Sequence, residues 1–193
     1  MGRWEPDARG RLLTAALELF TEQGYDATTA AQIAEHAGLT KTTLFRHFAD
    51  KREILFQGQP ALVSVVTAGV ESAPSDATPL ELLRAGLSAL CDAHVPEQQE
   101  IGRRIEQLVA VSPELQERTA FKRSALTSAL EAVLADRLGD RRLAGVLADL
   151  GIRAYYEGFA AWTDKRRANP LPDVVFYHLE ALEEALRGAL ASE

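Results

Sequence analysis

Apolar residues recur at helical spacing along almost the whole chain, and this periodicity is the feature that most constrains the fold. Between residues 7 and 23, for example, Leu13, Leu17 and Phe20 follow one another at steps of four and three residues, which places them on one face of a helix. The run most like a strand, VVFYHL at residues 174–179, continues directly into the helical pattern EALEEALRGAL. No other stretch alternates convincingly between apolar and polar residues. The sequence therefore predicts an all-α fold.

Length and charge place the chain among ordinary globular proteins. It has 193 residues, of which 47% are hydrophobic and 25% are charged, with a formal net charge of −7. These values suit one domain or two small ones. No apolar run approaches the roughly 20 residues needed to cross a bilayer, and the N-terminus lacks the apolar stretch of a signal peptide. Cys91 is the only cysteine, which excludes an internal disulfide. We expect a cytoplasmic protein with no membrane partner.

Helix start and stop signals divide the first 57 residues into four short helices. Thr29 is followed three residues later by Gln32, the spacing of a reciprocal capping box. Gly38 supplies a left-handed stop for the second helix. Thr40 is expected to cap the third helix and Asp50 the fourth, because short polar side chains accept hydrogen bonds from the first helical amides.

Residues 30–48 are predicted to form a helix, a short turn and a second helix. Gly38 lies in the turn, while Ile33, Leu39 and Leu44 are apolar where the two helices must meet. Any helical hairpin with a central glycine would show the same pattern. The outward face of the second helix therefore decides between a DNA-binding helix-turn-helix and an ordinary hairpin.

That outward face carries groups that can recognise DNA. At about 100° per residue, Thr42 and Arg46 point away from the inward Leu44. Thr43 and Phe45 lie on the flanks. Arginine reads guanine edges, threonine meets a base edge or a thymine methyl group, and helix N-termini accept phosphate oxygens. The predicted DNA-binding residues are Thr29, Thr40, Lys41, Thr42, Thr43, Phe45, Arg46, His47 and Lys51.

The charge of this segment differs from that of the remaining chain. Residues 40–52 contain four Lys or Arg and one Asp, whereas residues 58–193 contain fourteen Lys or Arg and twenty Asp or Glu. Because salt screens charges over roughly 8 Å, a phosphate would respond to the local patch more than to distant acids. The acidic remainder should discourage non-specific DNA binding.

Residues 14–55 resemble the N-terminal DNA-binding domain of the TetR/AcrR family of transcriptional regulators. The matching motifs are ALELF, the GYxxTT entry, IAEHAGLTKTTLFRHF and the following KxExL. The resemblance implies an all-helical homodimer with an operator-binding head at residues 1–57 and a ligand-sensing body at residues 58–193. Phe45 departs from the family pattern, which has tyrosine there. Its ring cannot make the phosphate hydrogen bond of a tyrosine hydroxyl, but it can pack on a sugar or a thymine methyl group.

The body helices are predicted from periodicity alone. Pro60 should kink or interrupt the helix that leaves the head. SAPSDATP at residues 72–79 should be a loop, with Thr78 capping a helix that begins at Pro79. Further helices are predicted to begin near Pro96, Pro113 and Asp140, and a last helix runs to Leu190.

A stripe of small residues marks the helix predicted over residues 140–163. It consists of Gly151, Ala154, Gly158 and Ala161. Glycine inside a helix costs roughly 1 kcal/mol relative to alanine, so these glycines should serve the close approach of another helix. That helix belongs either to the same subunit or to a second copy. The family resemblance implies that the last two helices of each subunit form a four-helix bundle across a homodimer interface.

Polar and aromatic residues interrupt the apolar faces of the body helices and are candidates for an effector pocket. The predicted ligand-binding residues are Cys91, His94, Phe121, Lys122, Tyr155, Tyr156, Phe159 and Trp162. Each has a simpler interpretation as well, because aromatic rings fill cores, histidines cap helix ends and lysine extends to water. The set as a whole predicts a small apolar or aromatic effector.

An enzyme or a metal protein is an alternative for the body. Cys91 and His94 could form a thiolate–imidazole pair, but nothing in the sequence orients the histidine, and two ligands do not fix a zinc ion. We therefore expect no catalytic residue, no metal and no cofactor. The sequence predicts a ligand-responsive regulator, a repressor that binds a palindromic DNA operator as a homodimer. A helical protein-interaction module without specific DNA binding is the remaining alternative.

Overall fold

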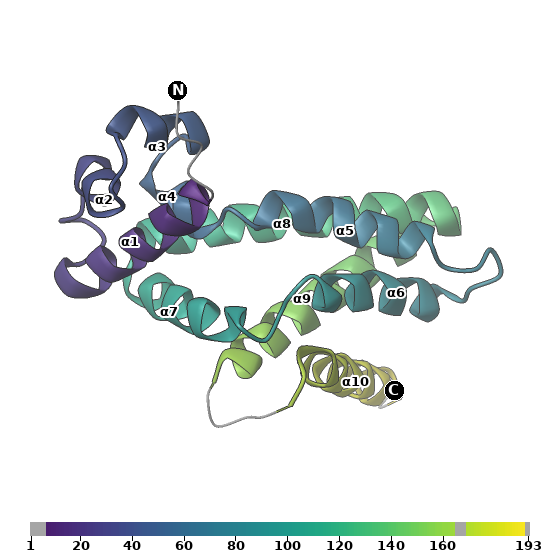
Figure 1. The fold of residues 1–193 in the computed structure, drawn as a ribbon. Coiled ribbons are helices and arrows are strands. Elements are labelled where there is room, and N and C mark those ends of the chain that lie inside the picture. Colours follow the sequence, from purple (N-terminus) through teal and green to yellow (C-terminus); the bar gives the residue numbers. More distant parts are fainter. Residues whose placement is uncertain (1–6, 165–168, 192–193) are drawn as a thin grey trace. The chain divides into compact units, whose positions relative to one another are not determined.

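The computed structural model describes residues 7–164 and 169–191, and all regular secondary structure in these residues is helical (Figure 1). The all-α prediction is thus confirmed for the described part of the chain. Its helices are α1 (Ala8–Gln23), α2 (Ala30–His36), α3 (Lys41–His47), α4 (Lys51–Leu55), α5 (Gln59–Glu71), α6 (Pro79–Asp92), α7 (Gln98–Val111), α8 (Pro113–Leu138), α9 (Arg141–Thr163) and α10 (Leu171–Leu190). None of the helices in the described residues is long and apolar enough to cross a bilayer.

The chain divides into two compact units. The head unit comprises Met1–Gly58 and Arg104–Thr119, and the body unit comprises Gln59–Arg103 and Ala120–Glu193. The second half of α7 and the first turns of α8 therefore belong with the helix-turn-helix. From the sequence, that segment is expected in the body, so the head unit is larger than the N-terminal residues alone.

Local signals set the helix ends of the head unit. Thr29 and Gln32 form the predicted capping box at the start of α2. The Thr40 side chain caps α3, and the Asp50 carboxylate caps α4. Gly38 adopts a φ of 67°, a left-handed conformation that disfavours other residues, and it ends α2 as predicted.

The chain leaves the helix-turn-helix through a break between two helices. α4 ends at Leu55 and α5 begins at Gln59. The predicted interruption is confirmed, but it precedes Pro60 rather than lying at it. Proline is tolerated in the first turn of a helix because the amide groups there have no partner within the helix.

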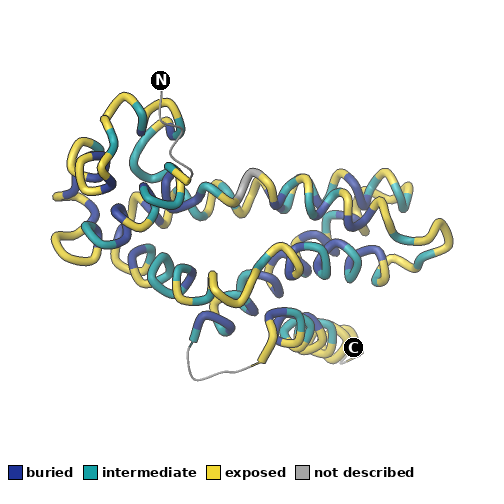
Figure 2. Tube along the Cα trace, in the orientation of Figure 1, coloured by how far each residue is buried: buried dark blue, intermediate teal, exposed yellow. Residues whose placement is uncertain are grey.

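Two helix pairs, α5 with α6 and α9 with α10, are the main contacts of the body unit. Leu83, Leu87 and Leu90 of α6 are fully buried, and Ala148 and Ile152 of α9 are buried as well. Buried residues form stripes along these helices in Figure 2, whereas the last turns of α10 are exposed. The apolar stripes of the sequence therefore form the core of this unit.

Arg137 of α8 closes the end of α5. Its guanidinium donates hydrogen bonds to the carbonyl oxygens of Val70 at 2.8 Å, Ala73 at 3.2 Å and Pro74 at 2.6 Å. The last carbonyls of a helix have no partner within it, and a positive charge is favourable there. One arginine thus fixes the turn between α5 and α6 onto α8.

The glycines of α9 pack against helices of the same chain. A methyl group added at Gly158 would lie 2.7 Å from the Cα atom of Val175 in α10. One added at Gly151 would collide with the Leu83 side chain of α6. Of the two possibilities that the sequence leaves open for these glycines, the structure shows the first, because their close neighbours belong to the same subunit.

Candidate functional site

Helix α3 presents one exposed face and one buried face. Lys41, Thr42, Phe45 and Arg46 are exposed, whereas Leu44 is fully buried. At about 100° per residue, the four exposed positions occupy a single arc of about 140°. We call these four residues the α3 face. It combines two cations, a hydroxyl group and an aromatic ring.

The turn before α3 is held by backbone and side-chain hydrogen bonds. The Leu39 amide donates to the Ala34 carbonyl at 2.8 Å, and the Gly38 amide donates to the Glu35 carbonyl at 2.9 Å. The Arg11 guanidinium of α1 donates to the Ala37 carbonyl. Because both neighbouring helices fix this turn, α3 is presented on a rigid support.

Several predicted DNA-binding hydroxyl groups serve as helix caps. Thr29 Oγ1 accepts a hydrogen bond from the Gln32 amide at 3.2 Å and lies 2.9 Å from the Gln32 side-chain oxygen. Thr40 Oγ1 accepts from the Thr43 amide at 3.1 Å and lies 2.9 Å from Thr43 Oγ1. Thr42 lies on the α3 face, so it is the threonine best placed to meet a base.

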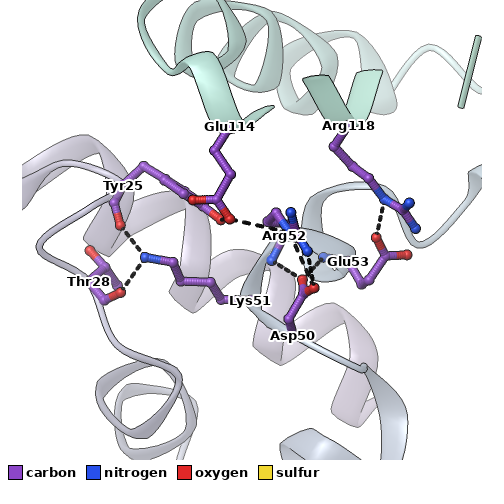
Figure 3. Close-up of polar contacts among 8 residues, drawn as sticks. All are labelled: Tyr25, Thr28, Asp50, Lys51, Arg52, Glu53, Glu114 and Arg118. Carbon is purple, nitrogen blue, oxygen red and sulfur yellow. Dashed lines mark hydrogen bonds and ion pairs between the residues drawn. The ribbon is translucent and has the colours of Figure 1, made fainter. Parts of the chain in front are cut away.

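Lys51 is engaged inside the head unit (Figure 3). Its ammonium group donates to the carbonyl oxygens of Tyr25 at 2.7 Å and Thr28 at 2.9 Å, and it lies 4.1 Å from the centre of the Tyr25 ring. These bonds tie the turn between α1 and α2 to the start of α4. The predicted contact of Lys51 with the DNA backbone is not supported by this geometry, and we leave it out of the interface.

Ion pairs connect the start of α8 with the rest of the head unit (Figure 3). Glu114 accepts a hydrogen bond from the Tyr25 hydroxyl at 3.0 Å and pairs with Arg52 Nε at 3.3 Å. One turn later, Arg118 pairs with Glu53 at 2.6 Å. We call these four charged residues, Arg52, Glu53, Glu114 and Arg118, the α4–α8 pairs. Burial, together with the hydrogen bond to Glu114, raises the pKa of Tyr25 above its ordinary value, so its hydroxyl stays protonated.

The α4–α8 pairs are not predictable from the sequence. Glu114 and Arg118 stand one helical turn apart, which predicts a shared face of α8. No pattern in the sequence, however, matches that face with Arg52 and Glu53, more than 60 residues earlier. Only the three-dimensional structure brings the two segments together.

Four of the predicted ligand-binding side chains form a cluster in the body unit. The His94 ring lies 6.1 Å from Tyr155, 5.1 Å from Phe159 and 6.4 Å from Trp162, measured between ring centres. His94 Nε2 and the Tyr155 hydroxyl are 2.7 Å apart. Tyr156 meets the Tyr155 ring edge-on at 5.4 Å. The aromatic cluster, meaning His94, Tyr155, Phe159 and Trp162, is therefore an apolar assembly with one hydrogen-bonded polar pair.

Burial sets the protonation of this cluster. It lowers the pKa of His94, although a hydrogen bond with Gln98 acts in the opposite direction, and it raises the pKa of Tyr155 above its ordinary value. Both groups are therefore neutral at neutral pH. The polar pair can recognise a ligand through hydrogen bonds rather than through charge.

A hollow of about 380 Å³ lies beside the aromatic cluster, lined by Pro96, Glu97, Gln99, Glu100 and Thr163. The Gln99 side-chain amide donates to the Trp162 carbonyl. A methyl group at Gly102 would touch the Phe159 ring at 3.0 Å. The first two turns of α7 thus pack directly on the end of α9. The hollow falls within the size range of small-molecule sites.

The first helices of the head unit match a known family. Residues 12–57 match the model for bacterial regulatory proteins of the tetR family. Residues 12–57 are therefore a DNA-binding domain of the tetR type. The regulator TcmR of Streptomyces glaucescens is 38% identical over 82 residues, which cover 42% of this chain and 36% of TcmR. The transcriptional activator FasR of Mycolicibacterium smegmatis is 36% identical over 87 residues, covering 45% of this chain and 40% of FasR. The chain thus aligns with well under half the length of these relatives.

Two solved structures share the fold over nearly the whole chain. FadR of Thermus thermophilus, a TetR-family repressor solved with lauroyl-CoA, is 22% identical, with a TM-score of 0.54 over 91% of this chain and 93% of its own. AmtR of Mycobacterium smegmatis is also 22% identical, with a TM-score of 0.57 over 94% of this chain and 88% of its own. At this level of identity the likeness concerns the fold alone.

The remaining predicted ligand-binding residues lie outside the aromatic cluster. Phe121 has 63% of its surface exposed, and Lys122 is half-buried beside it on α8. We leave both out of the pocket, because an enclosed site needs buried lining residues. Cys91 is buried near the end of α6, and burial raises the pKa of its thiol to about 12. A thiolate nucleophile is therefore excluded at neutral pH.

No group of three His, Cys, Asp or Glu residues in the described part of the chain could hold an ion. His94 instead bonds with Tyr155, and His36 pairs with Glu18 at 2.8 Å on the surface of the head unit. The relatives named above are transcriptional regulators by name.

Proposed function

We propose that this protein is a ligand-responsive TetR-family repressor that binds a palindromic DNA operator as a homodimer. The observation that supports this most strongly is the α3 face, backed by the fully buried Leu44. Arg46 is suited to guanine and Thr42 to a neighbouring base edge, while Lys41 is placed for a phosphate. His47 is half-buried at the end of α3 and lies beside the Phe48 ring, so we assign it a marginal role.

Repression is the mode that a relative suggests. KstR2 of Mycobacterium tuberculosis, a transcriptional repressor by name, is 45% identical over 47 residues, which cover 24% of each chain. A regulator of this kind blocks transcription while it occupies its operator. A ligand that binds better to the DNA-incompetent state releases it, by no more than the ratio of its two affinities.

A homodimer through α9 and α10 is supported by exposed apolar side chains. Five large apolar side chains on these two helices are each at least 38% exposed in the single chain: Leu143, Val146, Tyr177, Leu186 and Leu190. Exposed apolar residues grouped on neighbouring helices are typical of an interface. A two-fold axis would let each copy cover the same surface of the other.

The aromatic cluster and the hollow beside it are the proposed effector site. The rings of the cluster suit an aromatic or aliphatic compound, and the His94–Tyr155 pair supplies one donor and one acceptor. The hollow has a mostly polar lining that includes Glu97, Gln99 and Glu100, so it suits the polar end of such a compound. Tyr155→Phe keeps the ring and removes that hydroxyl. It should weaken release by the effector while leaving operator affinity without effector nearly unchanged. Operator DNA should weaken effector binding by the same factor by which the effector weakens operator binding.

The experiment that tests the function is a selection of random duplex DNA against the purified full-length protein. We expect one enriched sequence with two-fold symmetry and half-sites about one helical turn apart, near 34–36 Å. An asymmetric consensus would contradict the palindromic homodimer. Binding without any enriched sequence would instead favour a helical interaction module.

A further inference from the structure

Phe45 is the member of the α3 face that polar recognition does not explain. Its ring is 46% exposed, although the neighbouring apolar residues Leu44 and Phe48 are buried to 0% and 3% exposure. The fold thus buries the other large apolar side chains of this segment and leaves one ring outside. Thr42 and Arg46 stand on the same face, so the ring lies among the groups proposed to meet base edges.

The major groove offers little for an apolar ring to contact. The groups that the base edges present there are nitrogen or oxygen acceptors and amino donors, with the exception of one apolar group. That exception is the methyl group on C5 of thymine, which 5-methylcytosine also carries. A phenyl ring that faces the bases can therefore gain free energy by burying this methyl group and little else.

We infer that Phe45 is a specificity-determining residue that reads the 5-methyl group of one pyrimidine in each operator half-site. The inference rests on the proposed function and adds the chemical group that this residue recognises. It makes the operator sensitive to the methyl group itself, apart from base pairing and hydrogen bonding.

The location of Lys41 agrees with a Phe45 ring that contacts DNA. Its ammonium nitrogen lies 5.7 Å from the centre of the Phe45 ring, one helical turn earlier on α3. The contact places a positive charge beside the ring. When the ring enters the groove, that charge comes close to the phosphate backbone, where it is favourable.

The test uses the selected duplex with single thymines replaced by deoxyuridine, symmetrically in both half-sites. Uracil keeps the pairing and the O4 acceptor, and it lacks only the methyl group. At one position we expect affinity to fall by about fourfold per half-site, or roughly fifteenfold when both half-sites are changed. At the same position, 5-methylcytosine should bind more tightly than cytosine by the same ratio.

Variants of the protein assign the effect to one side chain. Phe45→Ala should bind the thymine and uracil duplexes equally, and Phe45→Leu, which keeps an apolar group, should retain part of the preference. Thr42→Ser removes the other methyl group near the bases and should leave the preference intact. Phe45 is exposed, so these variants should unfold at the wild-type temperature, which circular dichroism will verify.

Two results overturn the inference while leaving the proposed function in place. In the first, every thymine of an enriched operator can be replaced by deoxyuridine without loss of affinity. In the second, Phe45→Ala discriminates thymine from uracil as strongly as wild type, so that another residue reads the methyl group. If the selection enriches no sequence at all, the proposed function fails and this inference fails with it.

Discussion

Arg46 is the residue of α3 that is suited to hydrogen-bonded recognition of a base pair. Its planar guanidinium can bond both acceptors of a guanine, so Arg46→Ala should cost roughly 1–3 kcal/mol of operator binding and relax the preference at one base pair per half-site. Arg46→Lys keeps the charge without the paired bonds and should recover only part of the loss. Fluorescence anisotropy with the selected duplex and its single-base variants measures both effects. The assignment is falsified if Arg46→Ala binds that duplex as tightly as wild type at physiological salt.

Lys51 is expected to matter for folding rather than for DNA contact. Lys51→Met removes the hydrogen bonds to the Tyr25 and Thr28 carbonyls, and it should destabilise the protein by about 1–2 kcal/mol. Chemical denaturation measures this loss. The dependence of operator affinity on salt should stay the same, whereas losing a phosphate contact would lower its slope by about one. A lower slope with unchanged stability would restore Lys51 to the interface.

Residue roles set by short spacings could be predicted, and those set by distant partners could not. Thr29 and Gln32 are three positions apart, so the geometry of a helix start determines their capping box. Lys51 bonds carbonyl groups 26 and 23 positions earlier. The positive charge of Lys51 is compatible with a DNA phosphate and with the backbone carbonyls of a turn, and only the fold decides between them.

At the scale of helices, the α4–α8 pairs are expected to hold the head unit together. Arg118→Glu places a second negative charge beside Glu53. The repulsion should lower both the stability of the protein and its affinity for the operator. The double variant Glu53→Arg, Arg118→Glu restores opposite charges and should recover part of both. Both side chains are mostly buried, at 20% and 27% exposure, so we expect a coupling of about 0.5–1.5 kcal/mol in a double-mutant cycle of chemical denaturation. Coupling within error of zero would show that α8 is held by other contacts.

Helix packing in the body unit provides a matched pair of glycines on α9. Gly158→Ala places a methyl group 2.7 Å from the Val175 backbone, and it should destabilise the protein by about 1–3 kcal/mol. Gly145→Ala meets its nearest atom, on Glu131, only at 3.9 Å, and it should stabilise the helix by up to roughly 1 kcal/mol. Chemical denaturation at several protein concentrations separates this effect from dimerisation. A Gly158→Ala protein that is as stable as wild type yet monomeric would return this position to the dimer interface.

Periodicity predicts the existence of the helices well and their neighbours poorly. The stripe of small residues on α9 indicates a close approach, but composition alone does not reveal whether the approaching helix belongs to the same copy. Val175 and Leu83 answer this for Gly158 and Gly151. For the same reason, the membership of residues 104–119 in the head unit could not be predicted, because it depends on ion pairs between segments distant in the sequence.

For the whole molecule, operator binding should depend on the exposed apolar side chains of α9 and α10. Tight binding to a palindrome needs two linked heads, since linkage makes the second contact intramolecular. Leu186 and Leu190 are 45% and 72% exposed, so replacing both with glutamate should leave the fold intact and produce a monomer. Analytical ultracentrifugation at micromolar concentration should show this change for the double variant. Val111→Glu, at an apolar position on α7 that is 80% exposed, should remain a dimer.

The same monomer should bind a full operator about 10²–10⁴-fold more weakly, while its affinity for an isolated half-site stays that of the wild type. Anisotropy titrations with a full-operator duplex and a half-site duplex measure the two quantities side by side. A loss of half-site affinity would mean that the substitutions damage the head rather than the assembly. A wild-type protein that sediments as a monomer would remove the basis of the two-headed mechanism, because the α3 face of one chain would then have to account for all of the binding.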